Sequence, residues 1–232
     1  MARDSKLVRC SRALLLLAAS LALTACTSKL AKQEEFSGFL SDYSQLKPVV
    51  AADGTEVLRW TSPELQKRTF SKVMLDPVSI YPAPKPGPRL RSEVLSNLLV
   101  YLNKAIRKEV GNEFELVAEP GLDTLRVKAA ITGVRSRVED LAAYEYVPIA
   151  LVLAGANTAA GTRDHVVELF AEGELLDSYS GERLAAGVRK GFGRPLENDS
   201  QQVEMENVRP VLDAWAKAMV RLLRPLVQPK SG

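Results

Sequence analysis

Histidine and cysteine are scarce in this chain of 232 residues, and their scarcity limits the chemistry that it can perform. His165 is the only histidine, and Cys10 and Cys26 are the only cysteines. A serine–histidine–carboxylate triad would need all three groups together, but the neighbouring Asp164 would point to the opposite face of a strand. Zinc sites are built mostly from histidine and cysteine, so such a site has almost no ligands here. We therefore expect no metal, no cofactor and no catalytic role for His165.

The N-terminal region lacks an apolar run long enough to cross a membrane as a helix. The run from Ala13 to Leu23 has eleven residues. Such a helix would be about 16 Å long, whereas the hydrocarbon core of a bilayer is about 30 Å thick. Four basic residues precede the run: Arg3, Lys6, Arg9 and Arg12. A basic segment followed by a short apolar run is typical of a secretory signal peptide.

The four residues from Leu23 to Cys26 resemble the lipobox of bacterial lipoproteins. In that motif the cysteine thiol is acylated, for example with palmitate, and the chain is cut just before the cysteine. The resemblance implies that residues 1–25 are a signal peptide, that Cys26 is lipidated and that residues 26–33 form a short tether. The alternative is an ordinary signal peptide with a chance cysteine. The position of the motif, its leucine and its small residues favour the lipobox.

The residue after the cysteine bears on which membrane holds the anchor. In lipoproteins an aspartate at this position is the usual signal for retention in the inner membrane, and this chain has Thr27 instead. By resemblance to that sorting rule we expect an outer-membrane protein that faces the periplasm. Two acyl chains bind a bilayer stably, because each buried methylene contributes about 0.8 kcal/mol.

An excess of charge of either sign is also absent once the signal peptide is removed. Residues 1–25 carry four of the 31 basic and one of the 28 acidic residues, which leaves 27 of each sign. The basic pI of about 8.8 therefore reflects the signal peptide. A neutral body gives no electrostatic reason to expect a nucleic-acid partner. After acylation of Cys26 the mature chain also has no thiol for a disulfide.

Residues 34–232 have the length and the patterning of one α+β domain. Apolar stripes predict helices over 92–110, with Gly111 as the stop, and over 209–223, with a possible upstream extension from 201 to 207. Alternating or bounded apolar segments predict the strands. These strands are 57–60, 72–76, 114–117, 125–134, 164–176 and 183–189. We predict a two-layer fold, with helices covering one face of a mostly antiparallel sheet.

An aromatic segment begins the predicted domain. Phe36, Phe39, Leu40 and Tyr43 follow the spacing of one helical face, although Gly38 also permits a turn or an irregular arm. We favour packing of these aromatic side chains on the body. A partner-binding patch formed by Phe36, Phe39 and Tyr43 is the alternative.

Charged residues recur on the predicted sheet. Glu168, Glu172 and Glu174 are evenly spaced on one strand and so share a face, which we interpret as solvated. Paired carboxylates for acid–base chemistry or calcium binding are the alternative. A basic patch is also possible, but intervening acidic residues favour a solvated surface here too. Its candidate members are Arg135, Arg137, Arg163, Arg189 and Lys190.

The segment 147–156 is apolar, uncharged and rich in small residues. A buried core segment is the simpler interpretation. The functional interpretation is an exposed arm, with Leu151 and Leu153 docking on a second copy, a partner or the membrane surface.

Several segments together resemble the bacterial lipoproteins called domain of unknown function 3313. The resemblance rests on residues 35–46, 75–78, 120–126 and 176–182 and covers nearly the whole mature chain. It implies an envelope location and a similar architecture, and it implies no catalytic residue.

Two functions compete on the sequence. The first is a non-enzymatic, membrane-anchored envelope module that works by contact with another envelope protein or with itself. The second is a periplasmic binding module for a small apolar or lipid ligand, which an enclosed apolar pocket would favour. An enzyme would instead need clustered carboxylates with a shifted pKa in a cleft, and the sequence gives no reason to expect them.

Overall fold

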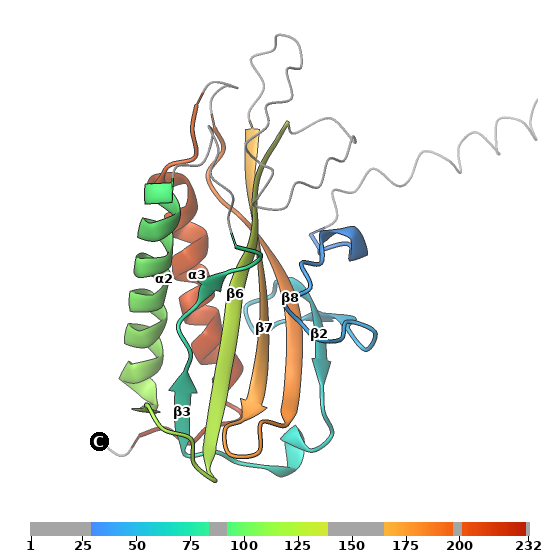
Figure 1. Cartoon of the computed structure of the whole chain (residues 1–232), viewed down its shortest axis with the longest axis vertical. Coiled ribbons are helices and arrows are strands. Elements are labelled where there is room, and N and C mark those ends of the chain that lie inside the picture. The colour runs from blue at the N-terminus through green and yellow to red at the C-terminus, as the bar shows by residue number, and fades with distance from the viewer. Residues whose placement is uncertain (1–28, 84–91, 139–164, 197–200, 231–232) are drawn as a thin grey trace, which may run out of the picture.

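The computed structural model describes residues 29–83, 92–138, 165–196 and 201–230. A twisted sheet carries two long helices on one face (Figure 1). An N-terminal arm, residues 29–46, packs against the other face. The predicted α+β class is therefore confirmed.

The sheet has eight strands, and seven of them follow in the order β1-β2-β8-β7-β6-β3-β5, while β4 pairs with β6 beyond the end of β3. The strands are β1 (Lys47–Val50), β2 (Glu56–Thr61), β3 (Lys72–Leu75), β4 (Ser79–Ile80), β5 (Glu115–Val117), β6 (Thr124–Val138), β7 (His165–Asp177) and β8 (Arg183–Phe192). The longest strands, β6 and β7, pair antiparallel along their whole length and form the spine of the body.

The prediction of a mostly antiparallel sheet is wrong, because the sheet is mixed. Four strand pairings are antiparallel, and three are parallel: β3 with β5, β3 with β6, and β4 with β6. Parallel neighbours need a crossover connection, usually a helix. The helix α2 (Ser92–Glu113) is that connection, since it lies between β3 and β5 in the chain.

Both predicted helices are present with shifted ends. Helix α2 continues through Gly111 to Glu113, because an isolated glycine is tolerated inside a helix. Helix α3 (Met205–Leu223) includes part of the predicted upstream extension. None of the helices in the described segments is both long and apolar enough to cross a membrane.

The main core lies between the helices and the sheet. The predicted stripe of α2 is buried, from Leu95 to Val110, and so is the face of α3 that includes Leu212 and Leu223. They pack on sheet residues such as Leu125. Burying one such side chain contributes about 1.5–3 kcal/mol, so this layer supplies most of the driving force for folding.

The N-terminal half of α3 lies unusually close to β8. A Cβ atom at Gly191 would lie 2.3 Å from Cγ2 of Val211 and 2.9 Å from Cζ2 of Trp215. A Cβ atom at Gly193 would lie 2.5 Å from the carbonyl oxygen of Asn207. Only glycine permits this approach, so the helix is held tightly against the sheet at this end.

The N-terminal arm is irregular, which is the second of the two alternatives for its aromatic residues, and no helix forms over them. Only Gln33–Glu35 form a single 3₁₀ turn, η1. The hydroxyl of Tyr43 accepts the N–H groups of Gly38 and Leu40, which replaces the hydrogen bonds of a helix. Ala31 is buried, so contacts with the body begin within the segment predicted as a tether.

Candidate functional site

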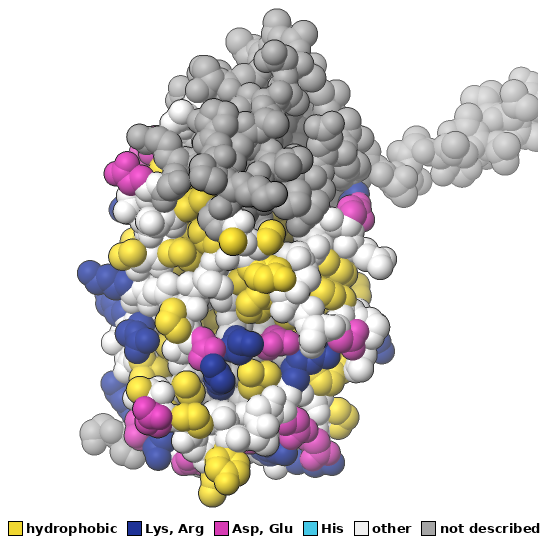
Figure 2. Space-filling view, viewed as in Figure 1, with side chains coloured by type: hydrophobic (Ala, Val, Ile, Leu, Met, Phe, Trp, Pro, Cys, Tyr) yellow, Lys and Arg dark blue, Asp and Glu magenta, His cyan; other side chains and the backbone are white. Residues whose placement is uncertain are grey.

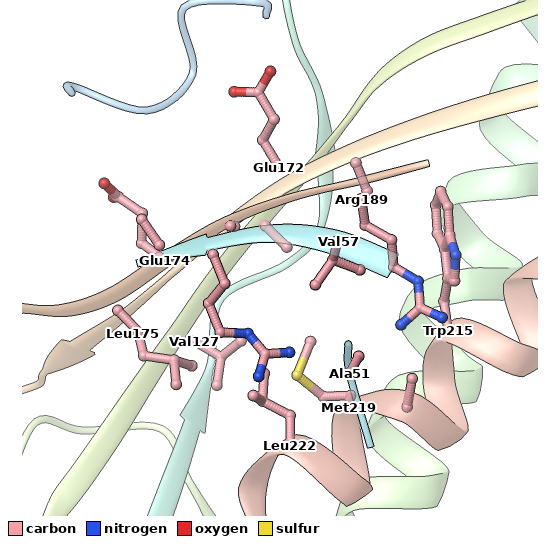
Figure 3. Close-up of a pocket in the computed structure, with 18 of the residues that line it drawn as sticks. Ala51, Val57, Val127, Glu172, Glu174, Leu175, Arg189, Trp215, Met219 and Leu222 are labelled. Atoms are coloured by element: carbon pink, nitrogen blue, oxygen red, sulfur yellow. The ribbon is translucent and has the colours of Figure 1, made fainter. Parts of the chain in front are cut away.

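A cavity of about 420 Å³ lies between the C-terminal half of α3 and the sheet (Figure 3). Val57 of β2, Val127 of β6 and Leu175 of β7 line its sheet side. Met219 and Leu222 of α3 line the helix side. The lining is predominantly apolar, and the volume lies within the range of about 300–1,000 Å³ that is usual for small-molecule sites.

The cavity exists because the sheet side chains beneath α3 are small. Ala129, Ala171, Gly173, Ala185 and Gly187 occupy the helix-facing positions of three adjacent strands. These residues leave the space that larger side chains would fill in a close-packed core. The other half of α3 instead packs closely on Gly191 and Gly193.

The width of the sheet leaves one side of the cavity open. Six spacings of about 4.8 Å make the seven-strand path about 29 Å wide, whereas two helices about 10 Å across cover about 20 Å. Helix α2 contacts β5, and α3 contacts β7 and β8. Strands β2 and β1 therefore extend beyond α3, and the cavity opens between them and that helix.

A charged group stands at this opening. Arg189 of β8 donates a hydrogen bond to Asp53, and a second, 3.2 Å long, to the hydroxyl of Thr55. Nη2 of Arg221, on α3, lies 3.9 Å from Oδ2 of Asp53. Burial alone would raise the pKa of Asp53, but the hydrogen bonds from Arg189 and Thr55 outweigh it and lower the pKa to about 2. The carboxylate is therefore ionised at neutral pH.

Arg59 of β2 also lines the cavity. Its side chain is half-buried, and it makes no hydrogen bond or ion pair with the described parts of the chain. Burial lowers the pKa of Arg59, and the nearby charge of Arg189 lowers it further, while Asp53 partly offsets both. A half-buried cation that makes no hydrogen bond is incompletely compensated, so an anion placed here would be stabilised.

A second charged cluster lies on the opposite face of the sheet. Glu168 is fully buried and contacts the guanidinium of Arg135, while Nζ of Lys190 lies 3.0 Å from its Oε1. Arg135 also lies 2.5 Å from Oε1 of Glu35 in the arm. Both cations lie near the ring of Phe170, with Cζ of Arg135 5.0 Å from its centroid. Such a buried network of ion pairs is typical of a structural element.

The prediction of a solvated glutamate face is therefore wrong. Glu168 is 0% exposed and Glu172 is 1% exposed, and the arm covers Glu172 through Ser37 and Tyr43. Figure 3 shows Glu172 and Glu174 pointing away from α3 and from the cavity. The predicted solvated basic surface is wrong for Arg135 and Lys190, which are buried, and Arg189 lies on the other side of the sheet.

Glu172 holds the arm in place. One of its carboxylate oxygens accepts the N–H of Ser37 at 2.8 Å, and the other accepts the hydroxyl of Tyr43 at 2.5 Å. Burial, together with the hydrogen bond to Glu172, raises the pKa of Tyr43 to about 12. Phe36 stacks on Tyr43 with 4.5 Å between ring centroids. The preferred interpretation of the aromatic segment, packing on the body, agrees with these contacts.

The other candidate residues are not brought together. His165 is the first residue of β7. Cys26, Leu151, Leu153 and Arg163 lie outside the described residues. No group of three or more potential metal ligands occurs within the four described segments. The sequence reasoning missed the residues of the cavity. The only signal for them was the run of small residues at alternate positions of the strands.

Comparisons with known proteins identify relatives of this chain. A family model described as "Protein of unknown function (DUF3313)" matches residues 35–219. The uncharacterized lipoprotein YdcL of Escherichia coli strain K12 is 37% identical over 196 residues, which cover 84% of this chain and 88% of that protein. A minor lipoprotein of Acinetobacter baumannii, a solved structure, is 11% identical with a TM-score of 0.37, covering 71% of this chain and 99% of that one. The solved structure of a hypothetical protein of Chlamydia trachomatis is 10% identical with a TM-score of 0.40. The match covers 66% of this chain and 96% of that one.

Proposed function

Because the chain belongs to the family called domain of unknown function 3313, in which a relative is a lipoprotein, we propose that it is a lipid-anchored envelope protein that binds an apolar ligand. The observation that carries the proposal is the cavity of about 420 Å³ beside α3. Its apolar lining and its opening past the edge of α3 are features of a small-molecule site.

The location that we propose fits this role. We propose that Cys26 carries the anchor and that the body faces the periplasm from the outer membrane, in keeping with Thr27 after the cysteine. The body then lies beside a bilayer, the main source of apolar ligands in the envelope. We propose binding rather than catalysis, since the clustered carboxylates Glu168 and Glu172 are held in contacts on the far side of the sheet.

Filling the cavity tests the proposal. Ala218 lies on the cavity side of α3, and Ala218→Phe places a ring in the space. We expect this variant to lose at least tenfold in affinity for a fluorescent fatty acid, measured by titration, because the apolar tail can no longer enter.

The matched control is Ala214→Phe, one turn earlier on the same helix, where the residue is exposed and does not line the cavity. Its affinity should remain within about twofold of the wild type, which corresponds to a difference of only about 0.4 kcal/mol. Equal affinities for the wild type and both variants would contradict binding in the cavity.

The protein-contact function has its own supporting observation. Leu122 is 78% exposed and Tyr179 is 70% exposed. They stand on two neighbouring turns joined by Ser178, whose hydroxyl accepts the N–H of Gly121 at 3.0 Å and donates to its carbonyl oxygen at 2.9 Å. Figure 2 shows hydrophobic atoms at this lower tip of the body. Exposed apolar groups held rigidly at one tip suit a protein contact.

In-cell crosslinking tests this second candidate. A photo-crosslinking residue at position 179 should capture one specific protein, whereas the same residue at Val100, which is 69% exposed on α2, should not. The same set of products from both positions would argue against a contact at the tip.

A further inference from the structure

The opening of the cavity combines an apolar interior with an excess of positive charge. We propose that the ligand is a single-chain amphiphile whose head is an oxyanion, either a carboxylate or a phosphate, and that Arg59 binds this head. This inference rests on the proposed binding function and adds the chemical class of the ligand.

The charge balance at the opening favours an anion. Three arginines line the cavity, Arg59, Arg189 and Arg221, and the carboxylate of Asp53 contacts the last two. Asp53 is already engaged by Arg189, and Arg221 is 3.9 Å away. The positive charge of this group therefore exceeds its negative charge by two. In a partly buried site such an excess attracts anions and repels cations.

The hydrogen-bonding capacity of these arginines is incompletely used. Nε of Arg189 and Nε of Arg221 are buried and have no hydrogen-bond partner within the described segments. Arg59 makes no hydrogen bond there at all. Buried donors are normally satisfied, so a missing acceptor is expected at this place. Guanidinium groups bind carboxylate and phosphate oxygens with two parallel hydrogen bonds, which matches an oxyanion head.

The cavity limits the apolar part of the ligand. Its volume of about 420 Å³ is near the lower end of the range for drug-sized ligands. Val57, Leu175 and Met219 also line the cavity, and their side chains are apolar. One acyl chain suits this space, whereas a phospholipid with two chains is too large for it. The opening between β2 and α3 lets the head remain at the surface while the chain enters.

A set of ligands that differ only in their heads tests the inference on the intact protein. Palmitate and a palmitoyl lysophosphatidate carry the two oxyanion heads. Hexadecanol carries a neutral head, and hexadecyltrimethylammonium a cationic one. Acetate and inorganic phosphate supply the heads without a chain. Binding is measured by isothermal titration calorimetry, with each chain-bearing ligand at a concentration where it is dissolved as monomers.

We expect palmitate or the lysophosphatidate to bind at least tenfold more tightly than hexadecanol, and hexadecyltrimethylammonium to bind more weakly still. Acetate and inorganic phosphate should show no binding at millimolar concentration. Arg59→Gln should weaken binding of the preferred oxyanion ligand about tenfold and change hexadecanol binding less than twofold. A tenfold loss of affinity for the oxyanion ligand is the size expected for losing a hydrogen bond between charged groups.

Two variants provide controls. Arg59→Lys keeps the charge and should recover part of the lost affinity. Arg107→Gln removes an exposed arginine from α2 and changes the net charge equally, so it should leave affinity unchanged. Because Arg59 has no partner to lose within the described segments, its substitution should not impair folding, which circular dichroism would check.

The outcomes separate the two proposals. Equal binding of palmitate and hexadecanol, unchanged by Arg59→Gln, would overturn the oxyanion inference and leave the apolar binding function standing. Preferential binding of the cationic amphiphile would overturn it as well. Failure of every amphiphile to bind would overturn the binding function itself, and the inference with it.

Discussion

Replacing Cys26 by serine is expected to abolish incorporation of an alkyne-labelled palmitate and to leave a precursor that retains residues 1–25. The reason is that acylation and cleavage in lipoproteins both depend on the cysteine thiol. The retained apolar segment would still hold that precursor at a membrane. A second form combines Cys26→Ser with a conventional cleavable signal in place of residues 1–25. This secreted form should therefore appear entirely in the soluble periplasmic fraction.

The expected change in membrane affinity is very large. Each buried methylene contributes about 0.8 kcal/mol, so removal of two or three acyl chains removes all stable attachment. The control is Cys10→Ser, which lies within the predicted signal peptide and should leave labelling and fractionation as in the wild type. Palmitate labelling that persists in the Cys26→Ser protein would contradict the anchor.

Replacing Glu168 by glutamine is expected to lower the free energy of unfolding by about 3 kcal/mol, measured by urea denaturation at neutral pH. Glutamine has nearly the same shape, so the loss isolates the charge. Arg135 and Lys190 are both buried and would lose their shared counterion, with Glu35 left near Arg135. Leaving a buried charge uncompensated is among the most damaging changes that a single substitution can cause.

The loss of unfolding free energy caused by Glu168→Gln should depend on pH. Burial by itself raises the pKa of Glu168, but the charges of Arg135 and Lys190 outweigh it, so the pKa lies below its ordinary value. The carboxylate therefore stabilises the fold above the pKa of an unfolded glutamate, about 4.3. This contribution is lost as the pH falls through the lower pKa of the folded state. The difference between the wild type and Glu168→Gln should narrow in acid.

An exposed ion pair gives the control. Glu64 and Lys67 lie 2.7 Å apart with both side chains largely in water. Glu64→Gln should leave the unfolding midpoint almost unchanged, since solvent screens such pairs. If Glu168→Gln were equally harmless, the cluster on this face would contribute no stability.

Local patterns in the sequence predict most of the elements. The stripe that ends at Val110 and the alternation from Leu125 to Ile131 are buried on the helix side of the sheet, as the spacing predicts. The parallel pairings were missed because the pattern of α2 does not reveal that it connects two parallel strands. Helix ends were misplaced by a few residues, since Gly111 permits a helix stop without requiring one.

A local pattern also does not reveal which distant segment packs on a strand, and this explains why the glutamates were predicted to be solvated. Their even spacing correctly predicts that Glu168, Glu172 and Glu174 share a face. It gives no information on what covers that face. Over Glu172 the cover is the arm, whose Ser37 and Tyr43 precede that residue by 135 and 129 positions in the chain.

The cavity could not be predicted for a related reason. Asp53, Arg59, Arg189 and Arg221 come from separate segments that only the pairing of β2 with β8 and the packing of α3 bring together. No local sequence pattern marks any of these four residues as part of a site. The small residues on β6, β7 and β8 become informative only when the strands are aligned in register.

The most direct test of ligand binding is the mass of the protein as the envelope delivers it. The Cys26→Ser form secreted with a conventional signal would be purified without detergent and weighed under native and then denaturing conditions. We predict one noncovalent ligand of the mass of a single-chain amphiphile per protein, absent after denaturation and absent from Ala218→Phe. Identical native and denatured masses, together with no uptake of added palmitate, would contradict the account.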